Sequence, residues 1–240
     1  MVLECWVACG NENDVSLRSA EGKPVIVSPN RFVFIHIPRT GGMAISNTVA
    51  SVLSEIPDTS ILLGGDGDIA SAPWRHSRAC EVAGTIPTWR DIRRFSVIRN
   101  PWDIVLSSWN LLRRDSHSLN ESKHLTTNSV QVYCDFIRDS LSMSFDEWIP
   151  WHFEYLREAG GFWNYWCLGA QGEDLGVRHV RFEQLNESWP NLCELMGIPP
   201  VALRHDNRSA SCAKWSPRAI QEVAELCRGD IERFDWQCPC

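Results

Sequence analysis

FVFIHIPRTGGMAIS, residues 32–46, is the stretch that decides the fold. Residues 32–37 are apolar apart from one histidine, and they are rich in aromatic and β-branched side chains, which is typical of a buried strand. Two glycines, Gly41 and Gly42, then mark a turn, and apolar residues at helical spacing follow from Met43. The stretch therefore predicts a buried strand, a tight turn and the start of a helix.

This turn has the chemistry of an anion cradle. Glycine lets the backbone approach a phosphate closely, and the N-terminus of the following helix presents free N–H groups and the positive end of its dipole. Arg39 adds a side-chain cation. The Walker pattern G-x-x-x-x-G-K-[ST] is absent, which disfavours an ordinary ATPase loop. The alternative is a Gly-Gly turn that only joins the strand to the helix.

A second motif, FSVIRNPWDIVLSSW at 95–109, has a similar organisation. Arg99 follows a predicted strand at 94–98, and Ser107 lies on the helix predicted over 101–112. Ligands of open parallel sheets bind at the carboxyl ends of strands, so both motifs are expected to face one crevice. There Arg99 offers a fork of donors to a phosphate and Ser107 a hydroxyl. The alternative is a structural network around Arg99 and a helix-surface serine.

The remaining patterns predict an α/β protein. Strands alternate with helices along the chain, which favours a mainly parallel central sheet with helices on both faces. A polar arm at 1–22 precedes a single domain at 23–240. Further strands are predicted at 25–27 and 177–182, helices at 43–56, 130–141, 145–159, 185–196 and 217–228, and loops at 115–129 and 201–215.

Composition excludes some classes of protein. The net charge of −7 argues against a nucleic-acid binder. Neither a signal peptide nor a membrane span is apparent, so a cytoplasmic location and no membrane partner are expected. The ten cysteines lack the spacing of a disulfide framework. Cys5, Cys9, Cys238 and Cys240 could converge on zinc, although the absence of paired CxxC spacing favours free thiols.

Together the two motifs resemble the sulfotransferase family that uses 3′-phosphoadenosine-5′-phosphosulfate (PAPS). The closest resemblance is to the branch with motifs of the type FVHIPKTGGTS and RNPWDRxxSxY, which includes the heparan sulfate 2-O- and 6-O-sulfotransferases and bacterial relatives. The later segments SFDEW, HVRFEQL, CELMGIP and HDNRS resemble that branch in the same order. The resemblance covers roughly residues 31–236. It implies a P-loop-like three-layer fold.

The resemblance also implies how the donor is bound. The loop would hold the 5′-phosphosulfate of PAPS, and Arg99 with Ser107 would hold the 3′-phosphate, which ATP lacks. Arg208 and Ser209 would close over the cofactor, and the product would be adenosine 3′,5′-bisphosphate. The loop residues concerned are Arg39, Thr40, Gly41, Gly42, Met43 and Ala44.

For the acceptor, the resemblance points to His76. Related bacterial sequences carry a histidine here that takes the proton of the acceptor, and imidazole titrates near neutral pH. The alternative is an exposed loop histidine beside Arg75 and Arg78. Trp74, two residues away, is the candidate for the wall of the acceptor site. Arg39 and the helix end supply positive charge, so the scheme requires no metal.

Two departures from the family pattern affect the loop. Arg39 replaces the usual lysine, which keeps the cation but changes its geometry. Met43-Ala44 replaces Thr-Ser, which removes two hydroxyl donors that Thr40 and Ser46 could replace. The expected activity is sulfuryl transfer to a hydroxyl or amine of a small-molecule or saccharide acceptor. The alternatives are a nucleotide-binding module with weakened turnover and, less favoured, an ATP-dependent small-molecule kinase.

Overall fold

The computed structural model describes residues 26–28, 32–53, 62–63, 77–119, 128–204 and 214–239. The chain divides into two compact units. One contains 21–99 and 163–208, and the other contains 100–162 and 209–240 together with 1–20. The arm predicted at 1–22 lies outside the described residues.

The first unit contains a five-stranded sheet in the order β3-β1-β2-β4-β5. Its centre is parallel: β2 pairs with β4, and β4 pairs with β5. Strand β1 runs antiparallel to both β2 and β3. The prediction of an α/β protein with parallel strands is confirmed, and the antiparallel part is an addition at one side. The strands are β1 (Ile26–Ser28), β2 (Phe32–Ile35), β3 (Leu62–Leu63), β4 (Arg93–Ile98) and β5 (Arg178–Arg181).

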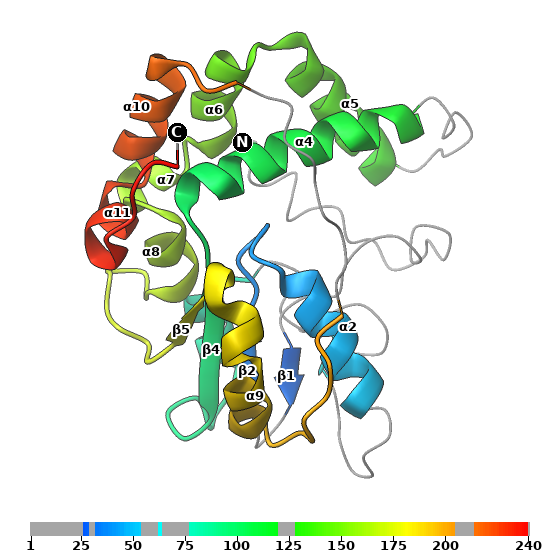
Figure 1. Ribbon diagram of the computed structural model, residues 1–240, viewed down its shortest axis with the longest axis vertical. Coiled ribbons are helices and arrows are strands. Elements are labelled where there is room, and N and C mark those ends of the chain that lie inside the picture. Colours follow the sequence, from blue (N-terminus) through cyan, green and yellow to red (C-terminus); the bar gives the residue numbers. More distant parts are fainter. Residues whose placement is uncertain are drawn as a thin grey trace. The chain divides into compact units, whose positions relative to one another are not determined.

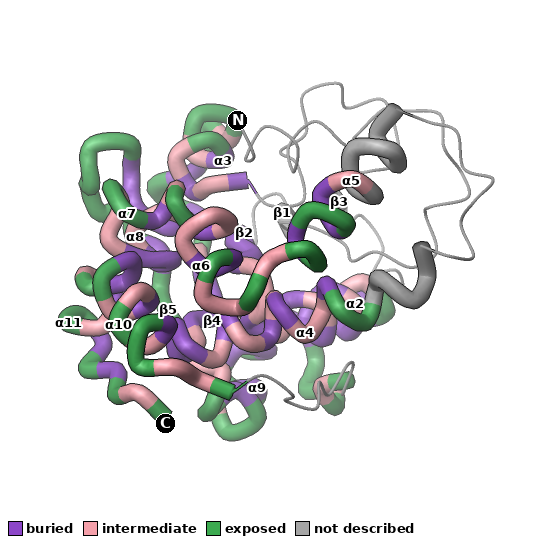
Figure 2. Tube along the Cα trace, turned by 90° about the horizontal axis from the view of Figure 1, so that it is seen from above, coloured by how far each residue is buried: buried purple, intermediate pink, exposed green. Residues whose placement is uncertain are grey.

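Two helices pack on one face of this sheet, α2 (Gly42–Leu53) and α9 (Leu185–Met196). Their apolar residues form one cluster with Phe32 and Phe34 of β2 and with Phe95 and Val97 of β4. Figure 1 shows both helices beside the strands, and in Figure 2 their tubes carry buried, purple segments. Alternation along the strands places these four side chains on the same face.

The opposite face of the sheet also meets a helix. His179 of β5 pairs with Ser96 of β4, which puts both on the face that the cluster does not use. Trp163 of α8 (Phe162–Cys167) contacts the His179 ring edge-on, with 5.7 Å between ring centroids. A short helix, α3 (Ala79–Thr85), precedes β4. Helices therefore contact both faces of the sheet.

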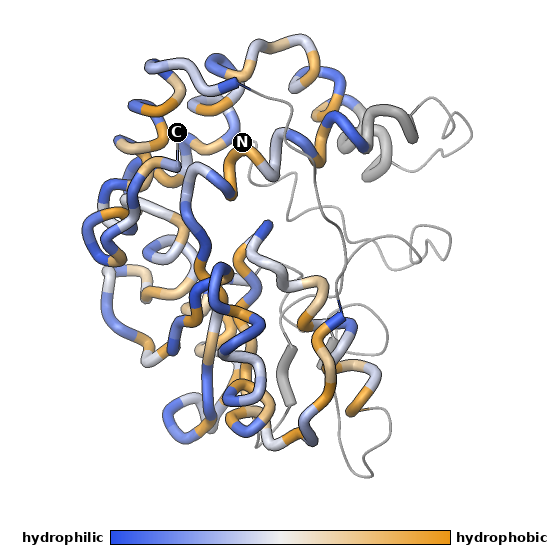
Figure 3. The backbone as a smooth tube through the Cα atoms, in the orientation of Figure 1, coloured by the Kyte–Doolittle hydropathy of each residue, from blue (hydrophilic) through white to orange (hydrophobic). Residues whose placement is uncertain are grey.

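The second unit is helical within the described residues. Its core is rich in aromatic rings, such as Trp109 and Trp148 with centroids 5.1 Å apart. Along the helix that begins at Pro217, apolar and polar positions alternate, visible as orange and blue in Figure 3. The helices are α4 (Pro101–Leu119), α5 (Asn128–Ser142), α6 (Phe145–Phe153), α7 (Leu156–Ala159), α10 (Pro217–Leu226) and α11 (Arg228–Phe234).

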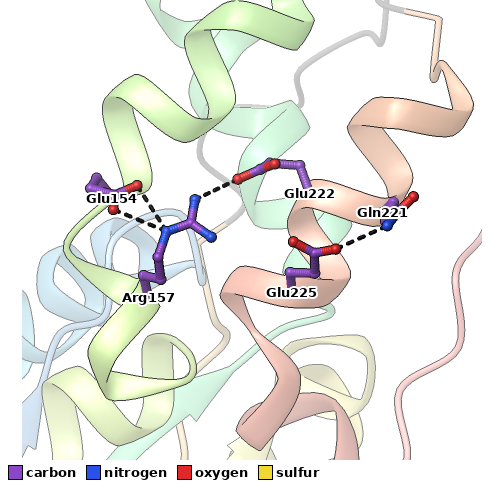
Figure 4. Close-up of polar contacts among 5 residues, drawn as sticks. All are labelled: Glu154, Arg157, Gln221, Glu222 and Glu225. Atoms are coloured by element: carbon purple, nitrogen blue, oxygen red, sulfur yellow. Dashed lines mark hydrogen bonds and ion pairs between the residues drawn. The ribbon is translucent and has the colours of Figure 1, made fainter.

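Polar side chains connect the helices of this unit. Arg157 of α7 donates to Glu154 at 2.9 Å and to Glu222 of α10 at 2.7 Å (Figure 4). Ser216 caps α10 by accepting from the Ala219 N–H, and its hydroxyl donates to Asp146 of α6 at 2.6 Å. These contacts fix α7 and α6 against α10.

Several predicted boundaries are wrong. Residues 115–119, predicted as loop, continue α4, because the polar run DSHSL shows no hydrophobic periodicity that would indicate a helix. The helix predicted over 145–159 is two helices, α6 and α7. Glu154 and Tyr155 between them keep right-handed dihedral angles, so the hydrogen-bond ladder is interrupted without a change to an extended backbone. The break at Gly160 is confirmed, with its φ of 75°.

Within the described ranges, no helix combines the length and the apolar character needed to cross a membrane.

Candidate anion-binding site

The loop between β2 and α2 has an unusual backbone. Arg39 adopts a left-handed conformation with φ of 66°, and Gly41 follows with φ of 83°. Thr40 between them is fully buried, and its hydroxyl donates to the Ile37 carbonyl at 2.8 Å. A left-handed residue other than glycine costs about 1–3 kcal/mol and is found most often at functional sites. The loop is therefore held in one conformation by its own side chains.

Both glycines of the loop lie against rings of the protein. A Cβ atom at Gly41 would lie 2.9 Å from Cε2 of Phe182, and one at Gly42 would lie 2.0 Å from Cδ2 of His36. His36 is buried and stacks on Phe34 at 5.8 Å. The sequence predicted that glycine serves the approach of a ligand. In the structure the missing side chains also allow the loop to pack onto these two rings.

Arg99 joins this loop to the neighbouring parallel strand. It follows β4 directly, as predicted, and its Nη1 donates to the Arg39 carbonyl at 3.1 Å. Its guanidinium lies over the Phe182 ring, 4.5 Å from the ring centroid. Arg99 is thus part of a structural network, the alternative stated for it above. An arginine has five N–H donors, so a role in such a network and a contact with an anion are compatible.

Charge at this edge of the sheet favours anions. The first turn of α2 contains no acidic residue, so the helix itself places no carboxylate against its dipole and N–H groups. Met43 is half-buried and Ala44 is buried. Thr40 and Ser46 are both fully buried. The surface of the loop therefore does not present these two hydroxyls, and their replacement of the lost Thr-Ser pair stays a prediction.

The other residues that the sequence predicted for the site do not lie in this part of the described structure. Ser107 belongs to the helical unit, where it is buried on α4, so the alternative of a helix-surface serine is wrong. Trp74, His76, Arg208 and Ser209 lie outside the described residues. The structure thus brings together the loop 39–44 and Arg99.

The segment that follows His76 is firmly held. Ser77 is buried, and the Arg78 N–H donates to the Glu81 carboxylate at 2.7 Å. The Arg78 guanidinium donates to the Tyr165 carbonyl at 2.9 Å and lies over its ring. Burial is the main cause that raises the pKa of Tyr165. The described part of the chain therefore resumes at Ser77, one residue after the predicted base His76, and these contacts hold it in place.

Phe182 is the site residue that sequence reasoning missed. It comes directly after β5, and β5 pairs with β4 so that Ile98 lies opposite Arg181. The next position on each strand is then Arg99 and Phe182. A parallel alignment of the strands predicted at 94–98 and 177–182 would have brought an aromatic ring beside Arg99, but the register is not readable from either strand alone.

The described residues hold no group of three or more histidine, cysteine or acidic side chains that could bind a metal. Cys5, Cys9 and Cys240 lie outside them, and Cys238 is a partly exposed free thiol. No family model, curated protein or solved structure matches this chain.

Proposed function

We propose that the chain is a PAPS-dependent sulfotransferase, which moves a sulfuryl group to a hydroxyl or amine. The observation that carries the proposal is the hydrogen bond of 3.1 Å from Arg99 to the Arg39 carbonyl. Through it, the Arg99 guanidinium contacts the loop that leads to the N-terminus of α2, after the neighbouring parallel strands β2 and β4. That edge of the sheet suits a ligand with more than one anionic group. The same arrangement supports a P-loop-like three-layer fold.

In the proposed reaction, the acceptor attacks sulfur in line with the leaving phosphate, as in phosphoryl transfer. The bond from the acceptor to sulfur forms while the bond from sulfur to the 5′-phosphate oxygen breaks, which releases adenosine 3′,5′-bisphosphate. His76 takes the acceptor proton. Arg39 and the loop N–H groups stabilise the charge that develops on the sulfuryl group and on the leaving phosphate.

The two phosphate ends of the donor are assigned to different residues. The loop 39–44 holds the 5′-phosphosulfate, and Arg99 with Ser107 holds the 3′-phosphate. Arg208 and Ser209 close over the nucleotide, and Trp74 forms a wall of the acceptor site. The acceptor is a small molecule or a saccharide, because a chain with a net charge of −7 repels a long polyanion.

A second candidate is a nucleotide-binding module with weakened turnover. The observation that favours it is the burial of Thr40 and Ser46, which leaves the hydroxyl donors lost at Met43-Ala44 without a replacement. Fewer donors at the transferring group lower transition-state stabilisation more than they lower binding. A kinase is less favoured, since the Walker lysine is absent.

A transfer assay distinguishes the three candidates. The full-length protein is incubated with PAPS labelled in sulfur, or with ATP labelled in the γ-phosphate, and with a panel of phenols, amines and simple glycosides. We expect label from PAPS alone to reach an acceptor, and the Arg39→Ala variant to transfer it about a hundredfold more slowly or less. Transfer from ATP alone would refute the proposal, and binding of adenosine 3′,5′-bisphosphate without any transfer would favour the inactive module.

A further inference from the structure

Phe182 contacts two parts of the candidate site, the glycine turn at Gly41 and the side chain of Arg99. It begins the short 3-10 turn Phe182–Gln184, which links β5 to α9. Its edge atoms Cε2 and Cδ2 would lie 2.9 and 3.1 Å from a Cβ atom at Gly41, which is closer than a real Cβ would tolerate. Its face carries the guanidinium of Arg99 at 4.5 Å from the centroid. One ring therefore contacts the glycine turn and supports the arginine.

These contacts form a closed circuit. Arg99 rests on Phe182 and donates to the carbonyl of Arg39, and Arg39 leads through Thr40 to Gly41, which rests on the same ring. The circuit includes the left-handed residue Arg39, whose carbonyl direction is set by the hydrogen bond from Arg99. An energetically unfavourable backbone conformation persists where several contacts fix it together.

The Phe182 ring packs against the hydrophobic core. Leu185, three residues later, is buried in the cluster that α9 shares with α2 and the strands, and Phe182 packs against that cluster. Trp189, one turn further along α9, donates its indole N–H to the Val201 carbonyl at 2.7 Å. Phe182 therefore contacts both the core and the loop, and connects the two.

We propose that Phe182 is a positioning residue for the anion site. It holds Arg99 in place, and through Arg99 it holds the Arg39 peptide, so that the loop N–H groups and the Arg99 guanidinium are oriented before the ligand arrives. Donors fixed in advance need no reorganisation during the reaction. The inference rests on the proposed function for its consequence in catalysis, but its structural part concerns the ligand-free protein.

The structural part is tested by hydrogen exchange on the ligand-free, full-length protein. Phe182→Leu removes the aromatic face while keeping an apolar side chain, and Phe182→Tyr keeps the ring as the matched control. We expect amides of 39–46 to exchange about tenfold faster or more in Phe182→Leu and in Arg99→Met, and close to the wild-type rate in Phe182→Tyr. Exchange in α9 should stay unchanged. Unchanged loop exchange, or an equal increase throughout the sheet and α9, would overturn the proposal.

The functional part is tested by a double-mutant cycle on the affinity for adenosine 3′,5′-bisphosphate. If Phe182 acts through Arg99, Phe182→Leu and Arg99→Met each weaken binding about tenfold, and the double variant is no weaker than the weaker single variant. Losses that multiply would overturn the proposal. If the wild type does not bind the bisphosphate, the proposed function fails, and the exchange measurement still decides whether Phe182 positions the loop.

Discussion

Gly41 occupies a position where both the backbone and a neighbouring ring exclude a side chain. Its φ is 83°, and a Cβ would lie 2.9 Å from Phe182. We expect Gly41→Ala to lower the free energy of unfolding by about 1 kcal/mol or more, because left-handed backbone and a ring contact are both penalised. Urea unfolding measures this. Gly84→Ala is the matched control: its Cβ meets nothing within 4 Å, so its stability should be unchanged or higher. Equal effects of the two changes would contradict the account of the loop.

Arg39 combines an unfavourable backbone with the proposed catalytic cation. Glycine accepts a φ of 66° readily, so Arg39→Gly should raise the free energy of unfolding by up to about 1 kcal/mol. The same change should cut turnover by about a hundredfold or more, because the cation at the leaving phosphate is lost. Arg39→Lys keeps a cation and is the control. A stable Arg39→Gly variant with full sulfuryl transfer would remove the side chain from its assigned role.

For single residues, the sequence identified the charged side chains of the site but not the residues that pack against them. Arg39 and Arg99 were identified from their places after predicted strands, and in the structure the Arg99 side chain contacts the Arg39 backbone. Phe182 was missed, because its importance comes from a parallel register that joins residues 83 positions apart in the chain. The burial of Ser107 was missed as well, since a serine on a helix carries no pattern of its own.

Helix α6 contains a histidine whose titration should affect stability. The His152 ring stacks on Trp148 with centroids 4.6 Å apart, and its Nδ1 atom is buried although the residue as a whole is partly exposed. Burial lowers the pKa of His152 from 6.5 to about 3. Between these values the unfolded chain binds a proton that the folded chain does not, so stability falls as pH decreases.

We expect the wild type to lose about 1.4 kcal/mol of unfolding free energy per pH unit in that window, relative to His152→Gln. Urea unfolding of both proteins at several pH values between about 3.5 and 6.5 gives the difference, in which the other titrating groups cancel. Parallel curves for the wild type and His152→Gln would show that the ring is accessible to protons.

The Arg157 contacts between α7 and α10 should contribute little. The side chains of Arg157, Glu154 and Glu222 retain 42%, 61% and 21% of their exposure, so water screens the interaction (Figure 4). Arg157→Met should lower the free energy of unfolding by less than about 1 kcal/mol, and less still at high salt. A loss above about 2 kcal/mol would mean that this arginine organises the helical unit.

Helices were predicted correctly where one hydrophobic periodicity dominates their sequence. The bounds of α9 and the starts of α4 and α10 agree with the sequence, because capping residues and Pro101 or Pro217 mark them. The short elements α3, α8 and α11 were missed, since six or seven residues show too little periodicity to identify a helix.

At the scale of the whole molecule, the division into two units was not foreseen. One of its boundaries falls between Arg99 and Asn100, the two residues that separate β4 from α4, where the sequence has no glycine- or proline-rich linker. A bound nucleotide would stabilise the chain by mass action, since it binds the folded protein alone.

That stabilisation is the most direct test of the central claim. The thermal unfolding temperature of the full-length protein is measured with adenosine 3′,5′-bisphosphate, ATP and ADP at equal concentrations. The account predicts a rise of several degrees with the bisphosphate and a much smaller rise with ATP or ADP, and it predicts that Arg99→Ala removes most of this preference. A larger rise with ATP than with the bisphosphate would contradict it.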